Sequence, residues 1–135
     1  MIPDGALPPE VTAVNGPFWA GSAAGELRLQ RCSSCGTVRH PAAQRCPACL
    51  SPDYRWEAMS GDAVLWSWTV LHRAPVPAYA GRVPYLVAYV RLREGPYMIT
   101  HLRGDLTELS VGMPLRIVFE PAGADRAVPV AAVVQ

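Results

Sequence analysis

Residues 32–49 read CSSCGTVRHPAAQRCPAC and contain all the cysteines of the chain: Cys32, Cys35, Cys46 and Cys49. The two residues within each pair allow a tight turn to direct both sulfurs at one point. Two such turns that face each other supply a tetrahedron of thiolates. The spacing therefore predicts a zinc ribbon that holds one Zn²⁺ per chain. Because four thiolates leave no open coordination position, we expect a structural metal.

Three other interpretations of these cysteines are an iron site, two disulfides and a redox pair. Spacing alone does not separate zinc from iron, which four thiolates also bind. Two disulfides would require an oxidising compartment, and the opening residues MIPDGALPPE lack the basic and apolar segments of a signal peptide. A thioredoxin-type redox pair would precede a helix in a βαβ pattern, which this sequence lacks. We therefore expect a metal site in a cytoplasmic protein.

The residues before the ribbon predict a short helix over 15–25. Asn15 is suited to the position before the first turn, and Gly25 is suited to the C-terminal stop. A helix this short is not stable alone, so we expect Phe18 and Trp19 to pack it against the rest of the protein. The prolines and weak periodicity of residues 1–14 predict an extended arm.

The residues after the ribbon predict a small β-barrel. They contain five strand-like segments, rich in β-branched and aromatic residues or alternating in polarity: 63–71, 85–93, 96–102, 115–120 and 127–135. Closure of five strands into a barrel would remove exposed edges. The predicted fold is mainly β, with an N-terminal arm and helix (1–25), a four-cysteine zinc ribbon (26–56) and a five-stranded OB-fold barrel (57–135).

The first of these segments is unusually apolar. Simple alternation would place Val64, Trp66, Trp68 and Val70 on one face of the strand. Such a face must be buried, either inside the barrel or against another protein.

The composition excludes several classes of function. The 135 residues carry a net charge of +1, which argues against a protein that binds nucleic acid through a basic surface. All 12 basic residues are Arg, so the chain has no Lys for a Schiff base or a P-loop. The longest uncharged run, residues 11–25, is too short and too rich in Gly and Pro to span a membrane.

No catalytic constellation is evident. The carboxylates are scattered, and no GxSxG, GxGxxG or HExxH motif occurs. The loop over residues 72–84 is flanked by Arg73 and Arg82, which could bind a phosphate or a partner's carboxylate or could simply be solvated. We expect no catalytic residues in this chain.

Five segments of the sequence resemble the DUF35 family of OB-fold, acyl-CoA-associated proteins with a rubredoxin-like zinc ribbon. The segments occur in the family's order and cover most of residues 16–120: GPFWAGSAAGELRLQRCSSCG (16–36), HPAAQRCPAC (40–49), SGDAVLWSWTVLHR (60–73), VPYLVAYVRLREGPYMITHL (83–102) and VGMPLRIVFE (111–120). The resemblance implies a partner of a thiolase or a thiolase-like retro-aldolase that acts on CoA thioesters in steroid side-chain or fatty acyl-CoA metabolism.

The same resemblance implies roles for individual residues. The four cysteines match the metal ligands, and Phe18, Trp19, Arg73, Arg82 and Tyr85 are expected to contact the partner enzyme or CoA. Because thiolase-like enzymes usually form dimers, we expect a heterotetramer of two chains of each kind, with acyl-CoA at the interface. The alternatives are a stand-alone acyl-CoA-binding module and an OB-fold and zinc-ribbon protein that binds single-stranded nucleic acid.

Overall fold

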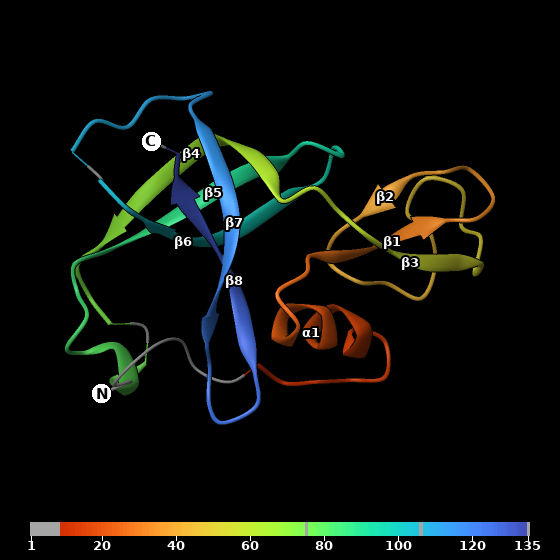
Figure 1. Ribbon diagram of the computed structural model, residues 1–135, viewed down its shortest axis with the longest axis horizontal. Coiled ribbons are helices and arrows are strands. Elements are labelled where there is room, and N and C mark those ends of the chain that lie inside the picture. The colour runs from red at the N-terminus through yellow and green to blue at the C-terminus, as the bar shows by residue number, and fades with distance from the viewer. Residues whose placement is uncertain (1–8, 75, 106, 135) are drawn as a thin grey trace.

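The computed structural model describes residues 9–74, 76–105 and 107–134 (Figure 1). Part of the arm predicted for residues 1–14 therefore lies outside the described residues. The elements in chain order are α1 (Gly16–Ala23), β1 (Arg28–Cys32), β2 (Val38–Arg39), β3 (Tyr54–Ala58), β4 (Asp62–Leu71), the 3₁₀ helix η1 (Pro77–Tyr79), β5 (Tyr85–Leu92), β6 (Tyr97–Arg103), β7 (Pro114–Pro121) and β8 (Ala127–Val133).

The helix α1 (Gly16–Ala23) lies within the predicted residues 15–25, between the N-cap Asn15 and Gly25. Asn15 is at the N-cap, but its side chain turns away from the helix, where its Oδ1 accepts a 2.7 Å hydrogen bond from the Thr12 amide. Gly25 follows the helix with a φ of +77°, which a residue with a side chain rarely adopts. A Cβ atom at Gly21 would lie 2.7 Å from the Glu26 carbonyl oxygen, so only glycine permits this close approach of helix and chain.

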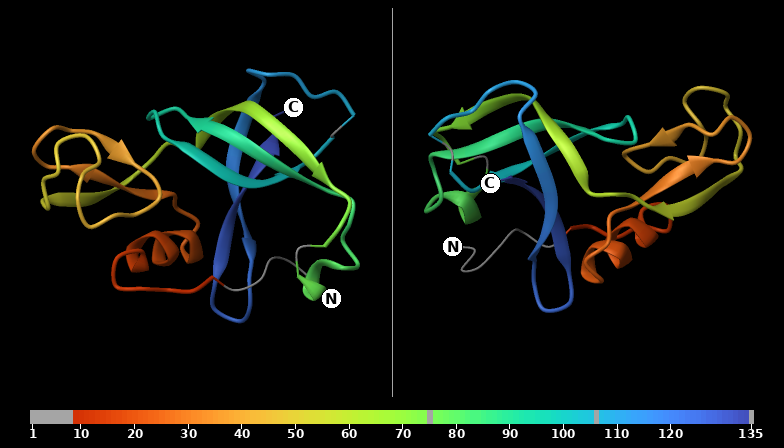
Figure 2. Two further views of the ribbon diagram at one scale, coloured as in Figure 1. Left: turned by 180° about the vertical axis from the view of Figure 1, so that it is seen from behind. Right: turned by 45° about the horizontal axis from the view of Figure 1, so that its top comes forward.

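The ribbon is a three-stranded antiparallel sheet in the order β2-β1-β3, to one side of the barrel in Figure 1. The barrel is closed, in the order β4-β5-β6-β8-β7. Its neighbours are antiparallel except for β6 and β8, which run parallel where Leu102 pairs with Ala131. Figure 2 shows the barrel from behind, with the ribbon and α1 beside it. The predicted mainly-β fold, with one short helix, a ribbon and a five-stranded barrel, is confirmed.

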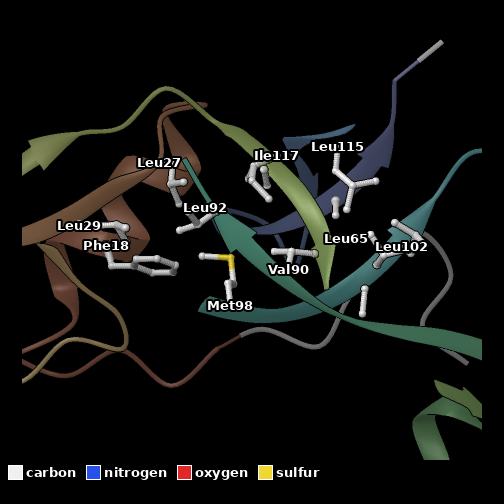
Figure 3. Packing of buried hydrophobic residues seen from close by; sticks show 13 residues of the cluster. Phe18, Leu27, Leu29, Leu65, Val90, Leu92, Met98, Leu102, Leu115 and Ile117 are labelled. Carbon is white, nitrogen blue, oxygen red and sulfur yellow. The ribbon is translucent and has the colours of Figure 1, made fainter. Parts of the chain in front are cut away.

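One hydrophobic core joins the helix, the ribbon and the barrel (Figure 3). Phe18 from α1 and Leu29 from β1 belong to the same buried cluster as Leu65, Val90 and Met98 of the barrel. Burial of apolar surface stabilises the fold by about 25 cal/mol for each Å². The prediction that Phe18 packs the helix against the rest of the protein is thus confirmed.

The predicted face of residues 63–71 is wrong, because β4 contains a bulge. The pairing with β5 shifts between Leu65 and Ser67, so Trp66 is the additional residue. Opposed residues on antiparallel strands share a face. Trp68, opposite the buried Ala88, therefore points to the inner face, whereas the Trp66 ring lies on the outer face, 5.5 Å from the ring of Tyr97. The two tryptophans lie on opposite faces.

Trp68 and Val70 are nevertheless exposed. The reason is that β7 pairs with β4 only from Asp62 to Val64, so the second half of β4 extends beyond this pairing. Among the described residues, no helix is long and apolar enough to cross a membrane.

Candidate metal centre and the surfaces around it

The sulfur atoms of Cys32, Cys35, Cys46 and Cys49 converge, all within 4.8 Å of one another. The Sγ atoms of Cys32 and Cys49 are 3.6 Å apart, as are those of Cys35 and Cys46. Four thiolates about 2.3 Å from one zinc ion in a tetrahedron would be separated by about 3.8 Å. The structure therefore brings together the four predicted ligands, positioned to bind one metal ion.

The two cysteine pairs are built from the same backbone turn. The amide of Cys32 donates to the Thr37 carbonyl at 2.9 Å, and the amide of Cys46 donates to the Ser51 carbonyl at 3.0 Å. The residue that follows each pair has positive φ, 78° at Gly36 and 66° at Leu50. Leu50 thus adopts, with a side chain, the conformation that glycine adopts without strain.

Hydrogen bonds prepare one sulfur to lose its proton. The Thr37 hydroxyl lies 3.1 Å from the Cys35 Sγ, and this contact lowers the pKa of Cys35 to about 6. The pKa of Cys49 is instead raised to about 12, although the backbone at Ser51 lowers it, because the other three sulfurs crowd around it. When one of these thiols ionises, its negative charge makes ionisation of the other three harder. A bound cation removes this conflict, because it stabilises all four thiolates at once.

The ribbon also buries a positive charge. Arg39 is buried, its Nε donates to the Gln30 Oε1 at 2.6 Å, and its guanidinium lies 4.8 Å from the centre of the Tyr54 ring. Among the described residues Arg39 forms no ion pair, whereas Arg31 pairs with Glu57 at 2.8 Å. A dication with four thiolates has a net negative charge, which a buried guanidinium in the same module partly offsets.

A cavity of about 570 Å³ lies between α1, the loop after β2 and the barrel. His40 lies in its wall and packs on Phe18 with the ring centres 5.2 Å apart, as a packing residue and not a ligand. Burial lowers the pKa of His40 to about 4. His101 lines the barrel side, and burial followed by the charge of Arg82 lowers its pKa. Both imidazoles are therefore neutral at physiological pH.

The five residues expected to contact a partner or CoA fall into separate places. Phe18, only 5% exposed, and Trp19 pack edge to face at 4.7 Å and line the cavity. Phe18 is thus accessible only to a molecule that enters the cavity. Arg82 lies 5.2 Å from the ring centre of Tyr79, and Tyr85 lies 5.6 Å from it.

The remaining one of the five, Arg73, is exposed just after β4 and makes no ion pair with any described residue. Tyr79 connects Arg82 and Tyr85 to the cavity, because its ring contacts both of them and also lines the cavity beside Phe18 and Trp19.

A cluster on the outer face of the barrel joins aromatic residues of β4, β5 and β6, and its contacts could not be predicted from the sequence. Tyr97 stacks on Tyr89 with the ring centres 5.0 Å apart, and the guanidinium of Arg91 lies 5.8 Å from the Tyr97 ring centre. The alternation of residues 85–93 places Tyr89 and Arg91 on one face. The contacts with Tyr97 depend on strand register, which the sequence pattern leaves open.

Comparisons with known proteins cover both modules. Residues 19–55 match the family model of the ChsH2 rubredoxin-like zinc ribbon domain, and residues 56–120 match that of the ChsH2 C-terminal OB-fold domain. A solved structure described as "Ltp2-ChsH2(DUF35) aldolase" has 32% sequence identity and a TM-score of 0.82, over 93% of this chain and 98% of that chain. The chain belongs to the DUF35 family. Its rubredoxin-like ribbon identifies the metal as one structural Zn²⁺ per chain, held by four cysteines.

A second DUF35 structure, from Sulfolobus solfataricus and of unknown function, has 17% identity and a TM-score of 0.65, over 92% of this chain and 87% of that chain. It supports the fold alone. A "DUF35 domain-containing scaffold protein" of Methanocaldococcus jannaschii is 28% identical over 66% of this chain and 64% of its own length.

Two longer relatives of this DUF35 chain are named as hydratase subunits. They are the "probable enoyl-CoA hydratase alpha subunit" of Thermomonospora curvata, 36% identical over 84% of this chain, and the "3-oxo-4,17-pregnadiene-20-carboxyl-CoA hydratase alpha subunit" of Mycobacterium tuberculosis, 34% identical over 88%. The chain spans 35% and 38% of their lengths, little more than a third.

Proposed function

We propose that this DUF35 chain is a non-catalytic accessory subunit that binds and supports a thiolase-like enzyme acting on acyl-CoA thioesters. The observation that carries the proposal is the match to the DUF35 chain of an aldolase, which extends over 98% of that chain and includes both modules. The names of the two hydratase subunits favour acyl-CoA substrates of steroid side-chain or fatty acyl-CoA metabolism.

The chemistry of the chain supports an accessory role. A metal with four protein thiolates has no position for water or substrate, so the ribbon stabilises the fold and does not activate a reactant. The sequence has no Lys, so a Schiff-base aldol mechanism would have to use a residue of another protein. The carbon–carbon chemistry is therefore assigned to the partner enzyme.

The same proposal includes the stoichiometry of the complex, its location in the cell and the residues at the interface. Two DUF35 chains bind a dimer of the partner in the cytoplasm, where the four free thiols are kept reduced for the metal. The division into residues 1–25, 26–56 and 57–135 separates the helix, the ribbon and the barrel. Phe18, Trp19, Arg73, Arg82 and Tyr85 contact the partner or an acyl-CoA at the interface.

A second candidate function, acyl-CoA binding by the chain alone, is favoured by the cavity of about 570 Å³ beside Phe18 and Trp19. This volume falls within the range of small-molecule sites. Calorimetry with CoA thioesters tests it directly. Saturable binding to the isolated chain would support a carrier role, and the absence of heat would remove it.

Purification of the tagged chain from its native host tests the main proposal. We expect a thiolase-like enzyme to co-purify in equal amount and to be identified by mass spectrometry. Elution of the chain alone, with no such enzyme in the bound fraction, would refute an accessory role.

A further inference from the structure

Five residues on the outer face of β4, β5 and β6 form a continuous surface, called here the aromatic face: Trp66, Tyr89, Arg91, Tyr97 and Ile99. Trp66 is 45% exposed, Tyr89 38% and Ile99 70%. The ring of Tyr97 joins the cluster, with Trp66 at its edge, Tyr89 stacked on it and Arg91 over it. The three strands lie side by side in the barrel (Figure 1).

The strand register keeps this cluster in solvent. Tyr89 pairs with Ile99, and Arg91 pairs with Tyr97, whereas the neighbouring Val90 points into the core. Because side chains alternate between the two faces of a sheet, the exposed rings cannot turn inward without displacing buried residues. Exposed aromatic clusters mark interaction surfaces, and Trp, Tyr and Arg are the residues that dominate binding energy at protein interfaces.

The charge around the aromatic face points to the chemistry of its partner. Residues 62–104, which span β4 to β6, carry five Arg and two acidic residues, Asp62 and Glu94. Two of these Arg are already paired, Arg93 with Asp62 and Arg103 with Glu120, each at 3.4 Å. Glu94 accepts a hydrogen bond from the Ser60 amide at 2.8 Å. Among the described residues no carboxylate pairs with Arg91. The aromatic face therefore presents the guanidinium of Arg91, placed over the Tyr97 ring, to a carboxylate of the partner.

A groove of about 590 Å³ extends the aromatic face to the ribbon. Tyr89, Tyr97 and Ile99 line its barrel side, and Thr37 and Pro47 line its ribbon side. A segment in this groove would contact both modules at once, so its binding would depend on the metal-held ribbon as well as on the barrel.

We infer that the aromatic face binds the thiolase-like enzyme, through an apolar segment of that enzyme that also presents a carboxylate to Arg91. The inference rests on the proposed function for the identity of the partner. The aromatic rings and Ile99 contribute the buried apolar contact, and the guanidinium of Arg91 orients the segment through a charge-assisted hydrogen bond.

Photo-crosslinking in the native host tests the location of the interface. A benzophenone amino acid is placed at Ile99, at Tyr89 or, as a control, at the exposed Val134 just beyond β8, in the full-length chain. We expect Ile99 and Tyr89, but not Val134, to crosslink to one thiolase-like enzyme, identified by mass spectrometry. Crosslinks to that enzyme from Val134 alone would overturn the surface and leave the proposed function standing.

Other crosslinking results would overturn either the proposed occupant, the interface or the proposed function. Crosslinks from Ile99 to a different protein, or to a second copy of this chain, would overturn the proposed occupant. An absence of crosslinks from Ile99 and Tyr89 would overturn the assignment of the face as an interface. A thiolase-like enzyme that neither co-purifies with the chain nor crosslinks to it at any of the three positions would refute the proposed function itself.

Affinity measurements with the purified partner enzyme give the energetic test. We expect Tyr89→Ala and Ile99→Asp each to weaken binding by about 30-fold or more, as hot-spot residues do. Arg91→Glu should weaken binding most at low salt, because its effect is electrostatic. Val134→Asp should bind as wild type. Circular dichroism and thermal midpoints check that the variants fold, and folded variants with unchanged affinity would contradict the inference.

Discussion

The buried imidazole of His40 makes the stability of the protein sensitive to acid. His40 follows β2, between the two cysteine pairs in sequence, and packs on Phe18; burial lowers its pKa to about 4. In an unfolded chain the pKa of His is about 6.5. Unfolded molecules therefore bind a proton at a higher pH than folded ones, so the free energy of unfolding must fall as the pH decreases from about 6.5 through about 4.

The size of the effect follows from the two pKa values. Stability is fully present above about pH 7, where the imidazole is neutral in both states. Protonation of the unfolded chain removes about 2 kcal/mol by pH 5 and about 3 kcal/mol by pH 4. Burial also lowers the pKa of His101, so the whole protein should lose somewhat more than His40 alone accounts for.

Urea denaturation of the zinc-loaded protein at pH 7.5, 6.5, 5.5 and 5.0 measures this loss. The variant His40→Leu removes the titrating group and keeps an apolar side chain against Phe18. His72→Leu is the matched control, because His72 is exposed. Acid also protonates the cysteine ligands, but this effect is common to all three proteins and cancels in the difference between them.

We expect the wild-type protein and His72→Leu to lose about 2 kcal/mol more than His40→Leu between pH 7.5 and 5.0. If all three proteins lose the same stability over this range, His40 has the same pKa in the folded and unfolded chains. That result would refute its burial as a neutral imidazole.

Three further predictions concern the ribbon and the core. Cys46→Ser should abolish stoichiometric zinc, measured by metal analysis, and unfold the ribbon, measured by loss of amide-exchange protection; a folded variant that keeps one zinc would contradict the four-cysteine site. Leu50 is 68% exposed and has positive φ, so Leu50→Gly should leave the stability of the protein unchanged or raise it by up to about 1 kcal/mol in chemical denaturation. Leu50→Val should destabilise the protein, because a β-branched residue tolerates positive φ poorly. Leu65→Ala should cost about 2–5 kcal/mol, because Leu65 is fully buried in the barrel; a loss below 1 kcal/mol would place it outside the core.

Local patterns were enough to predict most of the elements. The segment predicted over 63–71 is β4 (Asp62–Leu71), and that over 115–120 is β7 (Pro114–Pro121). The two cysteine pairs specify their metal centre because each pair is a short turn whose geometry depends on adjacent residues only. Side-chain alternation and turn spacing are both local, and a single sequence contains them fully.

The features that the sequence did not reveal depend on distant residues. The bulge at Trp66 reverses the expected faces of β4 from Ser67 onward, and nothing in the alternation marks the additional residue. The parallel pairing of β6 with β8 follows from barrel closure. The burial of His40 against Phe18 joins the ribbon to the helix across 21 intervening residues, and periodicity within one element does not report such a contact.

The most direct test of the accessory role is a titration of the purified thiolase-like enzyme with this chain, with acyl-CoA cleavage as the readout. We expect the chain alone to have no activity. With added chain the rate should rise and then saturate at one chain per catalytic subunit, in a complex of two and two. Turnover by the chain alone, or an enzyme whose rate and elution volume ignore the chain, would contradict the accessory role.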